Sequence, residues 1–257
     1  MSDGLGFTGA EARKKTMAEK VVIGNAELWH GDCREVALMV RSMQHGHIDA
    51  VITDPPYGIG FEYASYEDSR DNLRELLMFV VPWAHSYAKR SVFLCGVTQT
   101  HMYPEPDWMA CVTWDTTGSY GKCGYTQWMP VVFYGQDVPG FGNVEGAVTK
   151  SDVYRVTGGA GVGFARREVI AHPCPKPVNV MNWAVQRFSL RNEIVCDPFM
   201  GSGTTGVSCV QLGRRFIGIE LDRGYFEAAC RRIEEAQKQG TLLPPEEPRQ
   251  PVQEGLL

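Results

Sequence analysis

Short apolar segments alternate along this chain with longer segments that have helical periodicity. The run from Ile48 to Ile52 is almost entirely apolar, which is typical of a parallel strand covered on both faces. Further strands are predicted at 26–31, 91–96, 192–197 and 214–220, and helices at 33–43, 72–87, 178–188, 204–212 and 223–237, with Pro82 interrupting the second helix. Repeated strand–helix units predict an α/β fold with a doubly wound, mostly parallel sheet.

The segment from about 98 to 170 interrupts this alternation. It is rich in glycine and aromatic residues and lacks helical periodicity, so we predict a β-rich or irregular insertion whose aromatic side chains pack on the sheet. A role in target recognition is the alternative for part of it, because specificity commonly resides in loops on a rigid scaffold. We therefore predict one main domain over 21–237, a flexible N-terminus over 1–20, and a disordered, proline-rich tail over 238–257.

Composition excludes several classes of protein. Hydrophobic residues make up 44% of the 257 residues and charged residues 21%, as in an ordinary globular protein. No apolar run approaches the roughly 20 residues that span a bilayer, and the N-terminus lacks an apolar leader, so we expect a cytoplasmic protein with no membrane partner. The eight cysteines include no CxxC pair, which argues against a metal site or a disulfide framework.

The charge balance bears on nucleic-acid binding. The net charge of −5 argues mildly against a surface built to coat DNA, since phosphate contacts depend on Lys and Arg. A local basic patch from Lys150, Arg155, Arg166 and Arg167 is compatible with this balance, although such residues are also typical of a solvated face.

The strand that begins at Ile48 ends in the sequence Asp54-Pro55-Pro56-Tyr57. Proline fixes its own φ, has no N–H donor and drives the preceding residue toward extended geometry. The motif therefore presents a carboxylate and an aromatic ring on a stiff backbone. Alone, it would also fit a strand that ends in a simple turn.

A second motif follows the strand that ends at Asp197. The sequence "DPFMGSGTTG" sets Gly201 and Gly203 in a tight turn directly before a helix, where a backbone can approach a ligand closely. About twenty residues later, Glu220 ends the next strand. An acid at this position commonly accepts hydrogen bonds from the hydroxyl groups of a nucleotide ribose. Strand, glycine turn, helix, strand and acid together predict a site for an adenosine-containing cofactor.

Together, "DPPY" and "DPFMGSGTT…GIELD" resemble the amino-methyltransferases of DNA, which methylate the exocyclic amine of adenine or cytosine. The catalytic motif precedes the cofactor motif here, an order similar to the β group of that family. "HGDC" resembles the family's short GD motif, and "HPCPKP" resembles its HPxxKP segment, with Pro175 where Gln or Glu is common. The resemblance covers residues from about 27 to 57 and from about 172 to 227.

The resemblance implies a Rossmann-like methyltransferase fold, S-adenosylmethionine as the cofactor, and double-stranded DNA as the partner, within a restriction-modification setting. It implies that Asp54 and the Pro55 carbonyl accept hydrogen bonds from the target amine of a flipped base, while Tyr57 stacks on that base. The implied catalytic residues are Asp54, Pro55, Pro56 and Tyr57, and the implied cofactor residues are Asp32, Cys33, Lys176, Asp197, Phe199, Gly201, Gly203, Thr204, Thr205 and Glu220.

Alternatives stay open at this stage. Asp32 could simply cap the helix that follows it, and Lys176 could be a solvated surface lysine. Adenine-N6 methylation is favoured because Asp leads the tetrapeptide in most adenine enzymes of the family. Cytosine-N4 methylation, methylation of RNA or of a protein amide, and a non-catalytic module that binds an adenosine ligand are the competing functions. A homodimer is one alternative for the oligomeric state.

Overall fold

The computed structural model describes residues 18–42, 48–114, 119–121, 124–138, 151–156 and 176–240. Their strands are β1 (Glu19–Ile23), β2 (Ala26–His30), β3 (Ile48–Thr53), β4 (Ala88–Leu94), β5 (Trp108–Trp114), β6 (Ser119–Gly121), β7 (Gly124–Thr126), β8 (Trp128–Gly135), β9 (Val153–Val156), β10 (Ile194–Asp197) and β11 (Arg215–Glu220). The helices are α1 (Cys33–Ser42), α2 (Arg70–Tyr87), the short 3-10 helix η1 (Val97–Met102), α3 (Val178–Phe188), α4 (Thr204–Gln211) and α5 (Arg223–Gln239). None of the described helices is long and apolar enough to cross a membrane.

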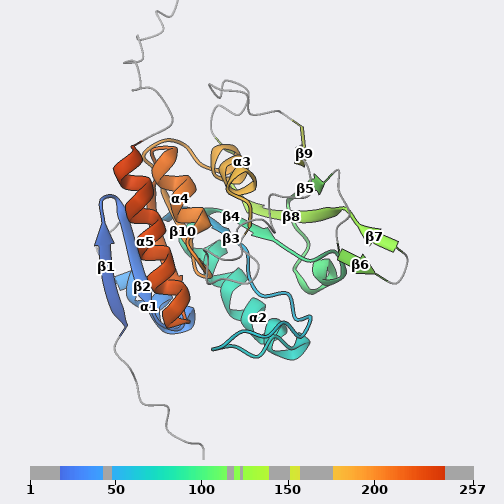
Figure 1. Cartoon of the computed structure of the whole chain (residues 1–257). Coiled ribbons are helices and arrows are strands. Elements are labelled where there is room, and N and C mark those ends of the chain that lie inside the picture. The colour runs from blue at the N-terminus through green and yellow to red at the C-terminus, as the bar shows by residue number, and fades with distance from the viewer. Residues whose placement is uncertain are drawn as a thin grey trace, which may run out of the picture.

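Nine of these strands form one sheet in the order β1-β2-β11-β10-β3-β4-β8-β5-β9, and β6 and β7 pair separately (Figure 1). The five central strands from β2 to β4 all run parallel, while β1 and β8 pair antiparallel with their neighbours. The predicted doubly wound, mostly parallel α/β fold is thus confirmed. Strand β3 lies between two parallel neighbours, as its apolar run predicted.

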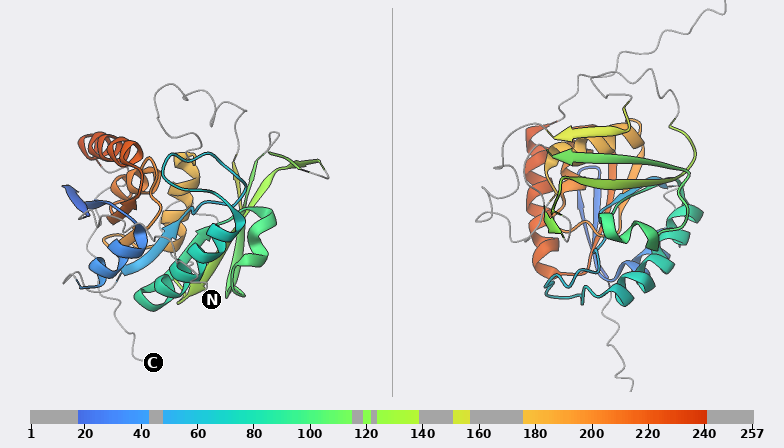
Figure 2. Two further views of the ribbon diagram at one scale, coloured as in Figure 1. Left: turned by 90° about the horizontal axis from the view of Figure 1, so that it is seen from below. Right: turned by 90° about the vertical axis from the view of Figure 1, so that its right-hand side faces the viewer.

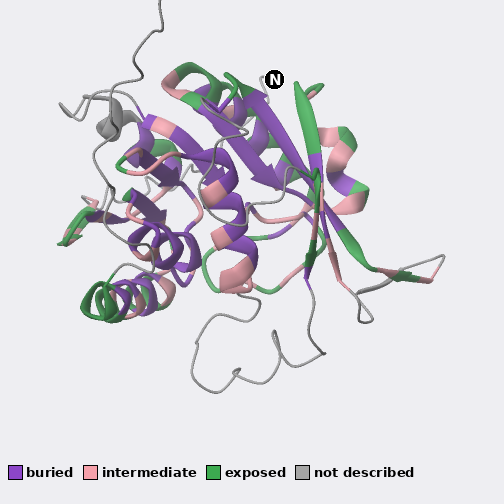
Figure 3. Cartoon of the chain, turned by 90° about the horizontal axis from the view of Figure 1, so that it is seen from above, coloured by how far each residue is buried: buried purple, intermediate pink, exposed green. Residues whose placement is uncertain are grey.

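Helices cover both faces of the sheet (Figure 2). Helices α3, α4 and α5 bury their apolar residues against one face, where Ala50 and Ile52 of β3 contribute to the core. Helices α1 and α2 cover the other face, which receives Val51. Successive residues of β3 therefore point into opposite layers, and Figure 3 shows the central strands buried between them.

The direction of winding reverses between β3 and β10. From β3 the chain crosses through α2 to β4 on one side, and from β10 it crosses through α4 to β11 on the other side. Although 144 residues separate Thr53 from Asp197, their side chains share a hydrogen bond at this boundary. Open α/β sheets bind ligands at such a reversal, outside the carboxyl ends of the strands.

Several details differ from the sequence-based expectations. Strand β1 begins at Glu19, inside the segment expected to be flexible, and α5 extends to Gln239, beyond the predicted domain end. Residues 1–17 and 241–257 lie outside the described ranges. Pro82 does not interrupt α2; it lies on the exposed face of a continuous helix, so water can hydrate the Met78 carbonyl that loses its N–H donor.

The sequence predicted an insertion over about 98–170, but three strands of this segment belong to the main sheet. Strands β5, β8 and β9 extend the main sheet, because the apolar run of β8 is buried between β4 and β5. Only the β6–β7 pair stands apart from this sheet among the described strands (Figure 1). Of the expected basic patch, Arg155 is exposed on β9, and Lys150, Arg166 and Arg167 lie outside the described residues.

Candidate active site

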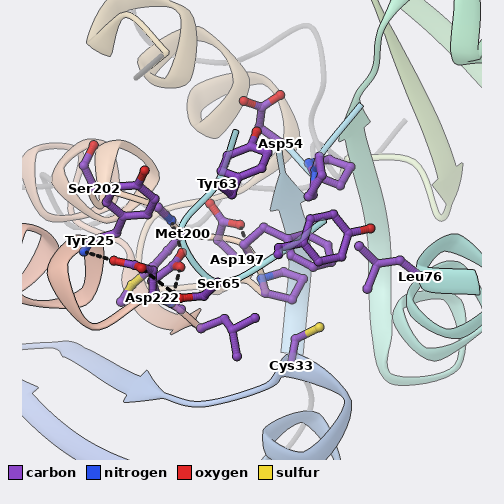
Figure 4. A pocket seen from close by; sticks show the side chains of 18 of the residues that line it. Cys33, Asp54, Tyr63, Ser65, Leu76, Asp197, Met200, Ser202, Asp222 and Tyr225 are labelled. Carbon is purple, nitrogen blue, oxygen red and sulfur yellow. Dashed lines mark hydrogen bonds between the residues drawn. The ribbon is translucent and has the colours of Figure 1, made fainter. Parts of the chain in front are cut away.

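One pocket opens at the carboxyl ends of the central strands, where the winding reverses. It is bounded by the loop after β3, the loop after β10, the start of α1 and the start of α5 (Figure 4). Every predicted site residue except Gly203 lines it: Asp32, Cys33, Asp54, Pro55, Pro56, Tyr57, Lys176, Asp197, Phe199, Gly201, Thr204, Thr205 and Glu220. Motifs that are far apart in the sequence thus face one cavity.

The Asp54–Tyr57 motif forms the part of the pocket next to β3. The Tyr57 hydroxyl donates a hydrogen bond of 2.6 Å to Asp54 Oδ1, and it also approaches Met129 Sδ at 3.3 Å. Lys176 Nζ lies 2.7 Å from Asp54 Oδ2 and 4.9 Å from the centroid of the Tyr57 ring. Pro55 is buried, whereas the Asp54 side chain is 23% exposed, so the carboxylate remains reachable from the cavity.

The glycine-rich loop after β10 forms the opposite part of the pocket. The Gly201 N–H donates to Glu220 Oε2 at 2.9 Å, and the Asp222 N–H donates to Glu220 Oε1 at 2.8 Å. Burial raises the pKa of Glu220 to about 7, and these two backbone donors only partly offset that effect. Each carboxylate oxygen keeps acceptor capacity for a further donor.

Gly203 has a different role from Gly201. It precedes α4 with a φ of +80°, a left-handed conformation that favours glycine. An added Cβ there would lie 2.9 Å from the Ala229 Cβ on α5, so the position is needed for close packing of α4 against α5. Because Gly203 does not line the cavity, its contribution to a ligand site is through the shape of the loop.

Asp197 is buried beneath the loop, and its carboxylate is occupied by protein groups. Thr53 Oγ1 and Thr205 Oγ1 donate to it at 2.5 and 2.6 Å, and the Phe199 N–H donates at 3.0 Å. Burial raises the pKa of Asp197 to about 6 despite these three donors. The carboxylate therefore ties β3, β10 and α4 together.

Asp32 and Cys33 border the pocket from the start of α1. Asp32 Oδ1 accepts the Arg34 N–H at 2.9 Å, and the Arg34 guanidinium pairs with both carboxylate oxygens. This geometry is that of a helix cap, one of the two roles left open by the sequence. Burial raises the pKa of the Cys33 thiol to about 12, so the thiol is neutral and unreactive near neutral pH.

The β3–α2 loop, residues 58–69, covers part of the pocket, although none of the sequence motifs includes it. Buried Asp68 holds this loop in shape by accepting the N–H groups of Gly58, Ile59 and Phe61 at 2.6, 3.0 and 3.1 Å. Tyr63 and Ser65 extend toward the cavity in Figure 4, and Ser65 Oγ donates to Asp222 at 2.9 Å. The aromatic-rich sequence directly after Tyr57 was the available signal.

Arg232 of α5 is a second omission. Its guanidinium donates to the carbonyl and hydroxyl oxygens of Ser202 at 2.6 and 2.8 Å, and to Thr204 Oγ1 at 3.2 Å. These bonds fix the glycine-rich loop from behind. Helical periodicity marks Arg232 only as a residue of α5, so the sequence offers no signal for this contact.

Fold and pocket together define a Rossmann-like α/β protein with a pocket at the carboxyl ends of its central strands. Comparison with known proteins agrees: residues 143–231 match a family model described as DNA methylase. The Type II methyltransferase M.HpaI of Haemophilus parainfluenzae is 25% identical over 234 residues, which cover 79% of this chain and 73% of that protein.

Solved structures show the same fold. M1.HpyAVI, solved as a complex with SAM, superposes with a TM-score of 0.58 at 22% identity, covering 81% of this chain and 98% of that one. PvuII DNA methyltransferase, described as cytosine-N4-specific, superposes with a TM-score of 0.61 at 14% identity, covering 84% and 91%. These structures share the fold of this chain, and the match to the DNA methylase family model, with the curated relative, bears out the resemblance to DNA amino-methyltransferases that the sequence motifs predicted.

Proposed function

We propose that this protein transfers a methyl group from S-adenosylmethionine to the exocyclic amine of a base in double-stranded DNA. One observation carries the proposal: the Asp54–Tyr57 motif and the Gly201–Glu220 loop and strand end face the same pocket. A cofactor bound near Glu220 would have its methyl group close to Asp54, whose carboxylate can accept a hydrogen bond from the target amine. The match to the DNA methylase family model supports this assignment.

The chemistry of the residues around Glu220 fits the cofactor. A ribose offers two hydroxyl donors, and the Glu220 carboxylate has acceptor capacity beyond its bonds to the Gly201 and Asp222 N–H groups. Donation by hydroxyl groups would stabilise the ionised form of this buried carboxylate. The apolar side chains of Phe199, Met200 and Leu221 line the same region and would contact the flat adenine ring.

Asp54 and Pro55 would act on the target amine. This nitrogen is a weak nucleophile because its lone pair is delocalised into the base. Hydrogen bonds from its two N–H groups to the Asp54 carboxylate and the Pro55 carbonyl would favour a pyramidal nitrogen with an available lone pair. S-adenosylmethionine supplies an electrophilic methyl group, so alignment and electrostatic stabilisation are the main tasks left to the protein.

Tyr57 would receive the flipped base. A base inside the duplex cannot reach a pocket at the sheet edge, so it must leave the stack and be held on an aromatic face. The Tyr57 ring borders the cavity beside Asp54, and its hydroxyl bond to Asp54 fixes the orientation of the ring. Stacking and amine recognition would therefore be coupled through one hydrogen bond.

We propose adenine-N6 as the target because an Asp leads the tetrapeptide, as in most adenine enzymes of the family. Cytosine-N4 is the second candidate, and the fold similarity to PvuII DNA methyltransferase, described as cytosine-N4-specific, favours it. Both amines present the same two donors to Asp54 and Pro55, so the motif alone would serve either base.

The test is transfer of labelled methyl groups from S-adenosylmethionine to unmethylated genomic DNA, followed by digestion to nucleosides and mass spectrometry. We expect N6-methyladenine; N4-methylcytosine would support the second candidate. Total RNA and a mixture of denatured proteins serve as competing substrates in parallel reactions. Labelling of RNA or protein without DNA would contradict the proposal, as would S-adenosylmethionine binding with no transfer to any substrate.

A further inference from the structure

Lys176 is predicted from the sequence to contact the cofactor, yet its ammonium lies against the other part of the pocket. Nζ is 2.7 Å from Asp54 Oδ2 and 4.9 Å from the centroid of the Tyr57 ring. The Tyr57 hydroxyl closes the triangle with its 2.6 Å bond to Asp54 Oδ1. One cation thus contacts both side chains that the proposed reaction needs.

The three side chains come from two segments that only the fold brings together. Asp54 and Tyr57 follow β3, and Lys176 lies two residues before α3, which begins at Val178. The Lys176 side chain is 15% exposed and that of Asp54 is 23% exposed, so solvent and salt screen this pair less than a surface pair. Leaving a partly buried carboxylate without its cation carries a desolvation cost.

We propose that Lys176 is a positioning residue that holds the Asp54 carboxylate, and with it the Tyr57 ring, in the orientation that receives the target amine. The proposal rests on the function proposed above and extends it to a residue outside the tetrapeptide. An ionised carboxylate has about four acceptor sites, so the bonds from Lys176 and Tyr57 leave capacity for an N–H of the base. The 2.7 Å contact with the ammonium fixes one carboxylate oxygen by a charge-assisted hydrogen bond, which restricts rotation of the Asp54 side chain.

Two other roles for Lys176 make different predictions. If Lys176 binds the cofactor, its loss should raise the dissociation constant of S-adenosylmethionine. If it only anchors the start of α3, its loss should lower the melting temperature and leave the rate of the folded protein unchanged. A positioning role predicts a slower methyl-transfer step with the cofactor affinity retained.

The experiment compares Lys176→Met, which keeps the length of the side chain but removes the charge, with Lys176→Arg, which keeps the charge. Single-turnover transfer to unmethylated DNA gives the rate, and calorimetry gives the dissociation constant of S-adenosylmethionine. We expect Lys176→Met to slow transfer by roughly 10-fold to 100-fold, with a dissociation constant within about twofold of wild type. For Lys176→Arg, we expect the logarithm of the rate to recover by at least a third of the drop seen with Lys176→Met.

Lys89→Met is the matched control. Lys89 forms an ion pair of similar length but with a more exposed ammonium, 2.6 Å from Asp49 Oδ1, at the opposite end of the central strands. Its loss should leave both the rate and the cofactor affinity unchanged. Lys176→Gln is a second neutral variant that keeps a hydrogen-bond donor, and we expect it to lose at least about 10-fold in rate. It tests the proposal if the methionine variant fails to fold.

A double mutant shows whether Lys176 acts through Asp54. In an Asp54→Asn background, Lys176→Met should cause no further loss of rate, because the carboxylate it orients is gone. An equal loss in both backgrounds would overturn the proposal, as would an unchanged single-mutant rate or a rate loss matched by weaker cofactor binding. Failure of the wild-type protein to methylate DNA would instead refute the proposed function, whatever the variants do.

Discussion

Two of the carboxylates that line the pocket are stabilised in their partly buried positions in different ways. Asp54, beside β3, is partly exposed and lies against the Lys176 ammonium and the Tyr57 hydroxyl. Glu220, at the end of β11, is also partly buried and accepts backbone N–H groups from Gly201 and Asp222. A cation lies against the Asp54 carboxylate. At Glu220, the two backbone N–H dipoles only partly offset the rise in pKa that burial causes.

The difference lies in how the hydrogen bonds of each carboxylate are satisfied. Asp54 is held by side chains of the protein, whereas Glu220 has acceptor capacity left for donors of a ligand. The ion pair with Lys176 orients Asp54 through protein groups alone. Glu220, with a pKa of about 7, is partly protonated near neutral pH and gains its full charge when further donors bind it. We therefore expect substitutions near Asp54 to change the rate of transfer and substitutions near Glu220 to change the affinity for the cofactor.

The largest expected effect is that of Asp54→Ala. Removing the carboxylate should slow single-turnover methyl transfer by roughly 100-fold to 1,000-fold, because positioning and electrostatic terms are worth several kcal/mol. The dissociation constant of S-adenosylmethionine should stay within about twofold of wild type, since the Glu220 part of the pocket is intact. Near-normal transfer by the folded variant would contradict a role for Asp54 in transfer, and the motif would then be only a stiff end of β3.

Asp71→Ala provides the control for that experiment. Asp71 is an exposed carboxylate in the first turn of α2, where it pairs with Arg74 at 2.8 Å. Exposed pairs of this kind contribute little to stability. Its loss should leave transfer and binding at wild-type values, so that any large effect of Asp54→Ala is due to its position in the pocket.

Glu220→Ala should weaken S-adenosylmethionine binding by roughly 10-fold to 150-fold, which corresponds to about 1.5–3 kcal/mol for hydrogen bonds to a charged group. At saturating cofactor the transfer rate should recover, because Asp54 and Lys176 are untouched. Isothermal calorimetry measures the affinity, and Glu227→Ala, which removes an exposed carboxylate of α5, is the control. Unchanged affinity would remove Glu220 from the cofactor site.

Cofactor affinity should also depend on pH. As the pH falls below about 7, Glu220 becomes protonated and loses acceptor capacity, so the dissociation constant should rise by up to about tenfold per pH unit. Calorimetry between about pH 6 and pH 8.5 measures this slope, and Glu220→Gln should flatten it. A slope that persists in Glu220→Gln would assign the titration to another group.

Stability of the free protein should follow the opposite trend. The pKa values of Glu220 and Asp197 are raised in the folded state, to about 7 and about 6, so the stability that their neutral forms contribute is present at low pH. This contribution is lost as the pH rises through those values. Thermal unfolding without ligand should show it, and saturating cofactor should reduce the part due to Glu220.

The smallest expected effect is that of Tyr57→Phe. The ring that would stack on a base is retained, and only the 2.6 Å hydrogen bond to Asp54 is lost. The net worth of one such bond, about 0.5–1.5 kcal/mol, predicts a loss of rate of roughly 2-fold to 12-fold. A loss as large as that of Asp54→Ala would mean that the hydroxyl has a role in transfer beyond orienting the carboxylate.

Local sequence was sufficient for the elements and the motifs. The apolar run of β3, the glycines of the loop after β10 and the helical periodicity of α3, α4 and α5 each identify a segment from its own residues. The proline-fixed backbone at 54–57 and the acid at 220 identify the two ligand-facing strand ends. The class of fold, the resemblance to DNA amino-methyltransferases and part of the pocket lining follow from these signals.

Other features depend on neighbours that the sequence does not reveal. The β-rich middle segment joins the main sheet because β8 finds an unpaired edge at β4, which no local pattern predicts. Helix α2 continues through Pro82 because that position faces solvent. The roles of Arg232 and of the 58–69 loop arise from contacts with the glycine-rich loop and with Asp222.

By itself, the sequence determined most of the central strands and helices and the two motifs that resemble those of DNA amino-methyltransferases, because these properties reside in short stretches of chain. Only the tertiary structure decided which ion pairs and hydrogen bonds the charged residues form. It placed the Lys176 ammonium against Asp54, and it placed the Glu220 carboxylate between two backbone donors. The physical reason is that hydrogen bonds and electrostatic interactions depend on distance and burial in space, and the packing of β3, β10 and α3 sets both.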